Sequence, residues 1–210
     1  MNELFNIEAT KTQGAVNTFR SIGASNHSES ERAALDLYCT EPQAVVDLLR
    51  REQFSNKVWE CAAGLGHLSE KMKEMGYDVL STDIVQRDYP LDRVQDFLFF
   101  DNCEETDRDI ITNPPFNLSC EFIVRGFSLL RNGGKMAMFL PLRYLAGKTR
   151  KAMVFDNFPP KVVYVFASRM RSTGKNGDFD GNSTSAIDFA WFVWEKTKMN
   201  RYRKTKVEWI

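Results

Sequence analysis

Residues 59–72 read WECAAGLGHLSEKM, and this stretch decides the predicted fold. The run 57–63 is apolar and typical of a strand, whereas 66–76 has the spacing of a helix that ends at a glycine. Gly64 and Gly66 lie between the two patterns. Glycine there lets the backbone turn tightly and come close to a ligand. The stretch therefore predicts a strand, a turn and a helix of an α/β sheet.

The same alternation of strand and helix continues along the chain. We expect strands over 57–63, 77–84, 94–100, 108–113, 135–141, 161–168 and 186–196, and helices over 41–52, 66–76, 118–134 and 145–158. Alternating units of this kind predict a parallel sheet with helices on both faces. The last two strands are separated by the irregular loop 169–185, which lacks a helical pattern, so we expect them to form an antiparallel pair.

Composition limits the class of protein. The chain has 210 residues, of which 43% are hydrophobic, and this suits one globular domain. Its N-terminus lacks a basic region followed by an apolar one, and no apolar stretch is long enough for a membrane helix, so a cytoplasmic protein is expected. Four cysteines without paired spacing and two histidines predict reduced thiols and no metal site. Nothing indicates more than a monomer or a weak dimer.

The predicted domain plan has three parts. A flexible N-terminal segment covers 1–35, a catalytic domain covers 36–196 with 169–185 as a variable loop, and a basic tail covers 197–210. Charge is divided along the chain, because residues 1–120 hold 11 basic and 21 acidic residues, whereas 121–210 hold 17 and 7. A basic second half favours a polyanionic partner such as nucleic acid, although it also fits a solvated tail.

Two acidic residues indicate which cofactor the glycine turn serves. Asp83 ends the second predicted strand, 19 residues after Gly64, where a carboxylate can accept hydrogen bonds from ribose hydroxyls. The dinucleotide fingerprint is incomplete because position 69 is serine. Glu60 precedes the turn and offers a carboxylate to an ammonium group, which S-adenosylmethionine has and NAD lacks. S-adenosylmethionine is therefore favoured over a nicotinamide cofactor, and a non-catalytic nucleotide binder stays open.

The order ECAAGLGHL, TDI, QDFLFF and NPPF resembles the amino-methyltransferases that act on exocyclic amines of nucleic-acid bases, above all the N6-adenine methyltransferases. The resemblance covers roughly 36–194. It implies the Rossmann-like class I methyltransferase fold, a seven-stranded, mostly parallel sheet with strand seven antiparallel between strands five and six. The small size and the closing AIDFAWFVWEK resemble short stand-alone forms found in phages and prophages.

The resemblance also implies a set of cofactor-binding residues. YCTEP at 38–42 matches an aromatic-x-Thr-x-Pro segment that touches the methionine end of the cofactor, and QDFL would bind the adenine ring, although Phe97 also fits a core residue and Asp96 a turn. The implied residues are Tyr38, Thr40, Glu60, Ala62, Gly64, Gly66, His67, Asp83, Ile84, Asp96, Phe97 and Asn113.

The motif NPPF at 113–116 carries the predicted chemistry. An exocyclic amine is a poor nucleophile, so the site must position it rather than deprotonate it. Asn113 offers its side-chain oxygen to the amine, and Pro114 offers a carbonyl that Pro115 restricts to extended backbone. Phe116 is expected to stack on the base. These four residues are the candidate catalytic group.

The leading substrate is the N6 amine of adenine in DNA, which would make the enzyme a site-specific adenine DNA methyltransferase. Besides Phe116, the candidate substrate residues are Arg143, Arg169, Arg171 and Lys175, of which the last three also fit solvated loop charges. The chain has no room for a large target-recognition domain. An RNA base amine and a protein glutamine therefore remain alternatives.

Overall fold

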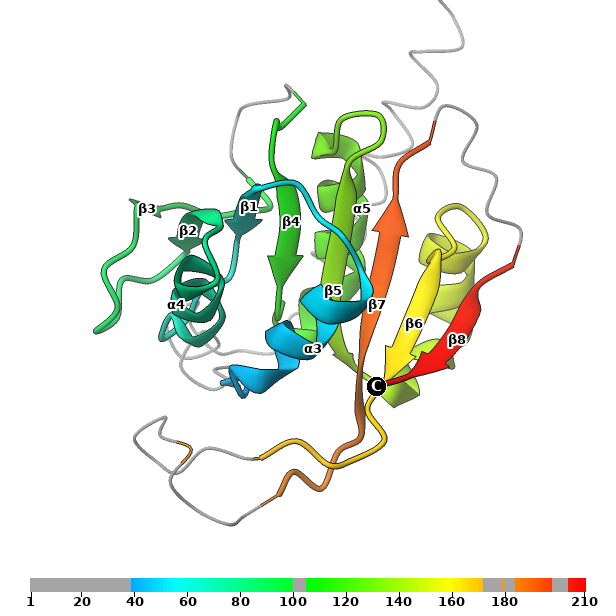
Figure 1. The fold of residues 1–210 in the computed structure, drawn as a ribbon. Helices are drawn as coiled ribbons and strands as arrows, with labels where there is room; N and C mark the ends of the chain where they lie inside the picture. The colour runs from blue at the N-terminus through cyan, green and yellow to red at the C-terminus, as the bar shows by residue number, and fades with distance from the viewer. Residues whose placement is uncertain (1–38, 100–104, 172–178, 180–183, 198–203) are drawn as a thin grey trace, which may run out of the picture. The chain divides into compact units, whose positions relative to one another are not determined.

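The computed structural model describes residues 39–99, 105–171, 179, 184–197 and 204–210. The predicted flexible segment 1–35 lies outside these residues. A mixed sheet of eight strands in the order β3-β2-β1-β4-β5-β7-β6-β8 forms the centre of the described part (Figure 1). Its strands are β1 (Lys57–Glu60), β2 (Asp78–Asp83), β3 (Arg93–Val94), β4 (Asp109–Thr112), β5 (Lys135–Pro141), β6 (Val162–Val165), β7 (Phe189–Glu195) and β8 (Lys206–Trp209).

Strand direction confirms the predicted topology. The pairs of β1 with β2 and β4, of β2 with β3, and of β4 with β5 are parallel. Strand β7 lies antiparallel between β5 and β6. All seven residues of β7 pair with β5, and its first six are buried, so this strand joins the two halves of the sheet.

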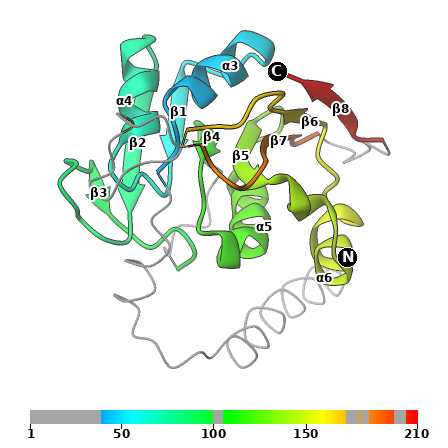
Figure 2. The same cartoon turned by 90° about the horizontal axis from the view of Figure 1, so that it is seen from below.

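Helices cover both faces of the sheet, as Figure 2 shows with α3 and α4 on one face and α5 and α6 on the other. The helical elements are α3 (Gln43–Arg51), α4 (His67–Glu74), the 3-10 turn η1 (Phe116–Leu118), α5 (Ser119–Leu129), the 3-10 turn η2 (Leu142–Leu145), α6 (Lys148–Arg150) and the π-turn η3 (Lys151–Phe155). None of the described helices has the length and apolar character needed to cross a bilayer. Each face has its own core. Val45 and Leu68 pack on one side of the sheet, and Phe122 and Phe127 pack on the other.

Two sequence-based expectations differ from the structure. The predicted helix 145–158 is broken, because Gly147 has a φ of 136° and only the short α6 and the π-turn follow it. The predicted basic tail instead contributes β8, which pairs in parallel with β6. All four residues of β8 are exposed, including the apolar Val207 and Trp209, which share one side of the strand. The polar and apolar residues alternate over these four positions only, which is a weak strand signal in a sequence.

Candidate functional site

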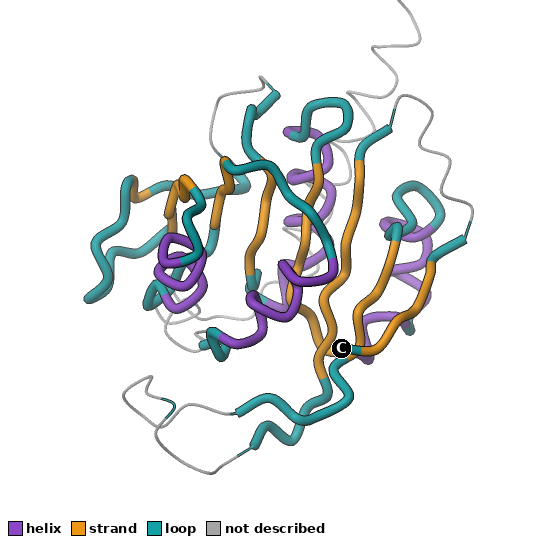
Figure 3. The backbone as a smooth tube through the Cα atoms, viewed as in Figure 1, coloured by secondary structure: helices purple, strands orange, loops and turns teal. Residues whose placement is uncertain are grey.

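The candidate site lies where the parallel strands end. Glu60, Asp83, Thr112 and Pro141 are the last residues of β1, β2, β4 and β5, so the segments that follow them meet at one edge of the sheet. Ligands of open α/β sheets bind outside this carboxyl edge. Figure 3 shows that the described loop segments after β6 and before β7 leave the sheet at the same edge.

The glycine turn, residues 63–66, is fixed to β2 by a buried carboxylate. Gly64 donates its amide N–H to Asp83 Oδ2 at 2.9 Å, and Val85 donates to Asp83 Oδ1 at 3.0 Å. Arg87 adds an ion pair to Oδ1 at 3.0 Å. A carboxylate has about four acceptor positions, so one remains for an incoming hydroxyl beside these three described donors. The acid predicted to bind ribose therefore also positions the turn.

The packing of the turn requires glycine at position 66. Its φ is 79°, in the left-handed region, and a Cβ atom placed there would overlap the ring of Tyr89. Tyr89 is buried and connects the turn to α4, because its hydroxyl donates to Glu70 at 2.7 Å and accepts from Lys73 at 2.8 Å. Gly66 therefore allows the turn to pack on Tyr89, whatever else the turn binds.

The residues expected to bind the adenine ring of the cofactor differ in their exposure. Ile84 is 47% exposed, which is unusual for a large apolar side chain that follows a buried strand. Phe97, by contrast, is 2% exposed and packs against Trp59 and Phe122, with ring centroids 5.2 Å and 4.9 Å away. Asp96 accepts from the amide of Leu98 at 2.9 Å. A ligand at this position could reach Ile84 by its side chain but Phe97 only by its main chain.

Glu60 is buried beneath the glycine turn and faces the start of α4. Ser69 donates its hydroxyl to Glu60 Oε2, and Ser81 donates to Ser69 at 2.8 Å. The hydroxyl of Tyr89 lies 3.4 Å from that of Ser81, so a chain of hydroxyl groups joins Glu60 to the surface at Glu70. Burial raises the pKa of Glu60 to about 8, although the hydrogen bonds from Ser69 oppose this shift. The carboxyl group is therefore largely neutral at pH 7.

Asn113 follows β4 and contacts the segment before α3. Its amide nitrogen donates to Thr40 Oγ1 at 2.8 Å, and Thr40 is buried. The structure thus brings together two residues that the sequence places 73 positions apart. Tyr38 and the rest of the chain before residue 39 lie outside the described residues.

The two prolines of NPPF end β4 and direct the chain into η1. Pro115 has a φ of −56° and a ψ of 126°, which is extended backbone, and Leu118 donates to its carbonyl at 3.0 Å. Phe116 begins η1 and packs near Phe189, with ring centroids 5.9 Å apart. The rigid turn therefore holds Asn113 and Phe116 at one place on the sheet edge.

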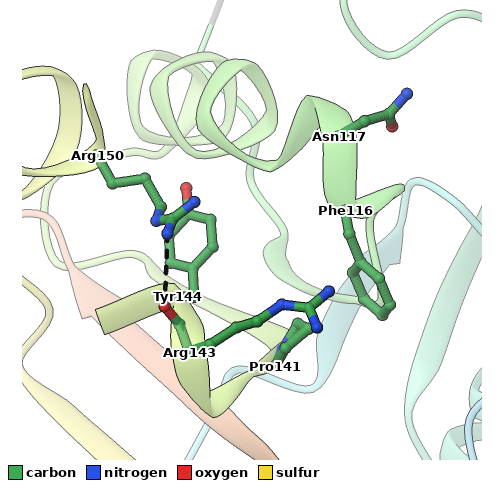
Figure 4. Close-up of a pocket in the computed structure, with 6 residues that line it drawn as sticks. All are labelled: Phe116, Asn117, Pro141, Arg143, Tyr144 and Arg150. Carbon is green, nitrogen blue, oxygen red and sulfur yellow. Dashed lines mark hydrogen bonds between the residues drawn. The ribbon is translucent and has the colours of Figure 1, made fainter. Parts of the chain in front are cut away.

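A pocket of about 250 Å³ adjoins this turn and is lined by Phe116, Asn117, Pro141, Arg143, Tyr144 and Arg150. In Figure 4 the side chain of Arg143 runs toward the ring of Phe116, and Asn117 points away from Tyr144. The guanidinium group of Arg143 has no hydrogen-bond or ion-pair partner among the described residues. The pocket therefore offers an aromatic ring and a free guanidinium group side by side.

Sequence reasoning missed Tyr144 and Arg150, which form the far wall of the pocket. The guanidinium carbon of Arg150 lies 5.1 Å from the centre of the Tyr144 ring, and its Nε donates to the carbonyl of Ala146 at 2.8 Å. The Tyr144 hydroxyl is 3.2 Å from Cys120 Sγ, and burial raises the pKa of both groups. Tyr144 lies shortly after β5, just as the NPPF motif lies directly after β4. Its position after a parallel strand is the sequence feature that could have marked it as a site residue.

The predicted arginines of the variable loop behave differently from one another. Arg171 pairs with Glu41, with Nε 2.6 Å from the carboxylate. Arg169 is exposed and lies 3.9 Å from Asp188. Lys175 lies outside the described residues. No group of histidine, cysteine or acidic side chains in the described ranges is arranged to hold a metal ion.

Comparison with solved structures identifies the fold. No protein-family model and no curated protein sequence matches the chain. A solved structure from Listeria monocytogenes, assigned as a class I S-adenosylmethionine-dependent methyltransferase, aligns with a TM-score of 0.52 and 12% identity over 95% of this chain and 71% of its own. The chain has the class I methyltransferase fold. This agrees with the strand order and with the antiparallel β7.

Two further solved structures are similar at lower scores. An RNA methyltransferase assigned in Pyrococcus horikoshii has a TM-score of 0.48 at 13% identity, over 67% of this chain and 74% of its own. TrmN from Thermus thermophilus has a TM-score of 0.46 at 19% identity, over 80% of this chain and 52% of its own. At these identities the comparisons concern the fold alone, so function must be argued from the site.

Replacing Gly66 with alanine tests the contact with Tyr89. We expect Gly66→Ala to lower the free energy of unfolding by about 3 kcal/mol, from left-handed strain plus overlap with the ring. The control is Gly76→Ala, because Gly76 has a φ of 92° but no atom lies within 4 Å of the place where its Cβ would stand. That control should cost about 1 kcal/mol. Chemical denaturation measures both, and equal losses would contradict the role of Tyr89.

Glu60 predicts a pH dependence of stability. Its pKa is about 8 in the folded protein against an ordinary 4.5, so the folded state holds the extra proton between these values. The contribution of Glu60 to the free energy of unfolding is therefore at its full value below pH 4.5 and is lost as the pH rises through 8. Glu60→Gln should flatten that fall, whereas Glu74→Gln, at the exposed end of α4, should leave it unchanged. Denaturation midpoints between pH 5 and 9 measure the difference, and a curve for Glu60→Gln parallel to that of the wild type would contradict it.

Proposed function

We propose that this protein is an S-adenosylmethionine-dependent methyltransferase that modifies the exocyclic N6 amine of adenine in DNA. The observation that carries the proposal is the turn that holds Asn113 and Phe116, with Phe116 lining a pocket, at the sheet edge that also holds the glycine turn and Asp83. Cofactor and acceptor would therefore meet at the ends of β1, β2 and β4, within one continuous edge of the sheet.

The residues present fit the proposed cofactor. Asp83 has an acceptor position for a ribose hydroxyl, and exposed Ile84 offers an apolar surface to the adenine ring. Thr40 and Glu60 are expected at the other end of the site, where a carboxylate would hold the ammonium group of the methionine part. Because the Glu60 carboxyl is largely neutral at pH 7, binding a cation there would favour its ionised form. When bound, S-adenosylmethionine supplies an electrophilic methyl group on a sulfonium sulfur.

The acceptor amine would be positioned by the NPPF motif. Because the Asn113 amide nitrogen faces Thr40, the amide oxygen is the end offered to the hydrogens of the target amine. The Pro114 carbonyl is the second acceptor, and together they direct the nitrogen lone pair toward the methyl donor. Transfer would form a nitrogen–carbon bond on the amine as the sulfur–carbon bond of the cofactor breaks, and the displaced amine proton would pass to water. Phe116 would stack on the base and offset part of the cost of unstacking it.

The pocket favours a nucleotide over a protein glutamine as the acceptor. An aromatic ring beside a guanidinium group suits a planar base and a phosphate, whereas a glutamine side chain is neutral and aliphatic up to its amide. An RNA base amine fits the same features. The choice of DNA rests on the resemblance of the motif order to the adenine methyltransferases.

A transfer assay tests the proposal directly. The full chain is incubated with S-adenosylmethionine carrying a tritiated methyl group and with duplex DNA, single-stranded DNA, RNA or a protein extract. Nucleoside mass spectrometry then identifies the modified base and atom. We expect N6-methyladenine in DNA. If the label appears only in RNA or only in protein, that polymer replaces DNA as the proposed substrate. If calorimetry shows binding of NAD but not of S-adenosylmethionine, the protein is not a methyltransferase.

Asn113→Ala should lower kcat for methyl transfer by about a hundredfold or more, while the affinity for the cofactor stays within about tenfold of the wild type. The reason is that the amide oxygen is offered to the target amine, whereas the cofactor would keep its expected contacts with Asp83 and Ile84. Asn56→Ala is a matched control, because Asn56 is exposed before β1 at the opposite edge of the sheet. Equal activity of the Asn113 variant and the wild type would remove the residue from the mechanism.

Arg143→Ala should weaken nucleic-acid binding and reduce its salt dependence by about one unit in the slope of log K against log salt. The free guanidinium beside the pocket would otherwise contact one phosphate. Arg93→Ala is the control, since Arg93 is exposed on β3, far along the sheet order from β5. Fluorescence anisotropy of a labelled oligonucleotide at several salt concentrations measures both. An unchanged slope for Arg143→Ala would show that it meets no phosphate.

A further inference from the structure

The segment that follows β6 is tied to the segment that precedes α3. Arg171 donates its backbone N–H to Glu41 Oε2 at 2.9 Å and its side-chain Nε to Glu41 Oε1 at 2.6 Å. Two donors from one residue thus hold both oxygens of one carboxylate, which fixes direction as well as distance. The Glu41 side chain is 12% exposed, against 49% for Arg171, so the carboxylate is well shielded from water.

Glu41 is the direct neighbour of Thr40, which contacts Asn113. On its other side the segment continues into α3, where the Ala44 amide donates to the Glu41 carbonyl at 2.9 Å. Trp191 of β7 donates its ring N–H to the Ala44 carbonyl at 2.8 Å. The start of α3 is therefore fixed to the sheet, whereas the Glu41 side chain is held by the loop beyond β6. Movement of that side chain would pass directly to Thr40.

Arg171 also reaches toward the glycine turn. Its NH1 donates to the Phe179 carbonyl at 3.0 Å, and the Phe179 ring meets the His67 ring edge-on, with centroids 5.2 Å apart. His67 is the first residue of α4 and follows the turn directly. The contacts of one arginine thus lead to both Thr40 and the start of α4.

We propose that Arg171 is a positioning residue that holds Thr40, and through it the Asn113 amide, in the orientation the reaction needs. The inference rests on the proposed function for its catalytic consequence. It replaces the phosphate contact expected from the sequence, because an arginine that already binds a shielded carboxylate through two donors would have to give up that pair to bind a phosphate. Arg169, two residues away, has one long and exposed ion pair, with Asp188, among the residues that the structure describes.

The variants Arg171→Ala, Glu41→Gln and their combination test the inference. The control for activity is Arg50→Ala, which removes an exposed ion pair with Asp47 on α3, and the control for the Asn113 signals is Arg169→Ala. Each single variant at the pair should lower kcat by about tenfold, because small displacements of a positioning group are costly. KM for the oligonucleotide and the salt slope of its binding should stay at the wild-type values. The double variant should be no worse than the poorer single variant, since both remove the same contact. Arg50→Ala should leave kcat unchanged.

A readout that needs no turnover separates this inference from the proposed function. The side-chain amide signals of Asn113, identified by their loss in Asn113→Ala, are followed by nuclear magnetic resonance in the full chain. Arg171→Ala and Glu41→Gln should shift or broaden them, and Arg169→Ala should not. Unchanged Asn113 signals in Arg171→Ala would overturn the inference, as would a salt slope reduced by about one unit. Absence of methyl transfer to every polymer would overturn the proposed function but leave this measurement valid.

Discussion

The hydrogen bond between the Gly64 amide and the Asp83 carboxylate is the contact on which the arrangement of the site depends. It joins the turn after β1 to the end of β2 and lies in a buried position. Without it the carboxylate would be buried with fewer donors, which is costly, and the turn would lose its anchor on the neighbouring strand. The ends of β1 and β2 therefore form one rigid unit. The NPPF turn is attached to this unit through β4, which pairs with β1.

The two acids of this unit have opposite environments. Asp83 receives donors from Gly64, Val85 and Arg87. Glu60 is buried against hydroxyl groups, and burial raises its pKa. The acceptor capacity of Asp83 is thus largely used in holding the glycine turn, whereas Glu60 is joined only to the hydroxyl chain through Ser69 among the contacts described above.

Much of the fold could be predicted from the sequence, because apolar strands that are buried on both faces alternate with helices that have one buried face. The antiparallel β7 followed from the irregular loop before it. Exposed β8 was missed because its alternation of polar and apolar residues covers only four positions, and the π-turn at Lys151–Phe155 was missed because 145–158 has the residue spacing of one continuous helix. Within the site, the motif residues Gly64, Asp83 and Asn113 follow or end neighbouring strands, and their roles stay predictions. The contact of Arg171 with Glu41 joins residues 130 positions apart, and no local pattern encodes such a pair.

The antiparallel direction of β7 has a consequence for how such a protein can change. Since β6 and β7 run in opposite directions, the connection between them leaves and re-enters the sheet at the edge that carries the site. The Arg171–Thr184 bridge closes the base of this connection, and lengthening the loop beyond it costs little closure entropy. Residues can therefore be inserted there without a change in the register of any strand. The strands of the sheet and the length of this connection are thus separate in the chain, and the contacts of Arg171 and Phe179 are what join the two.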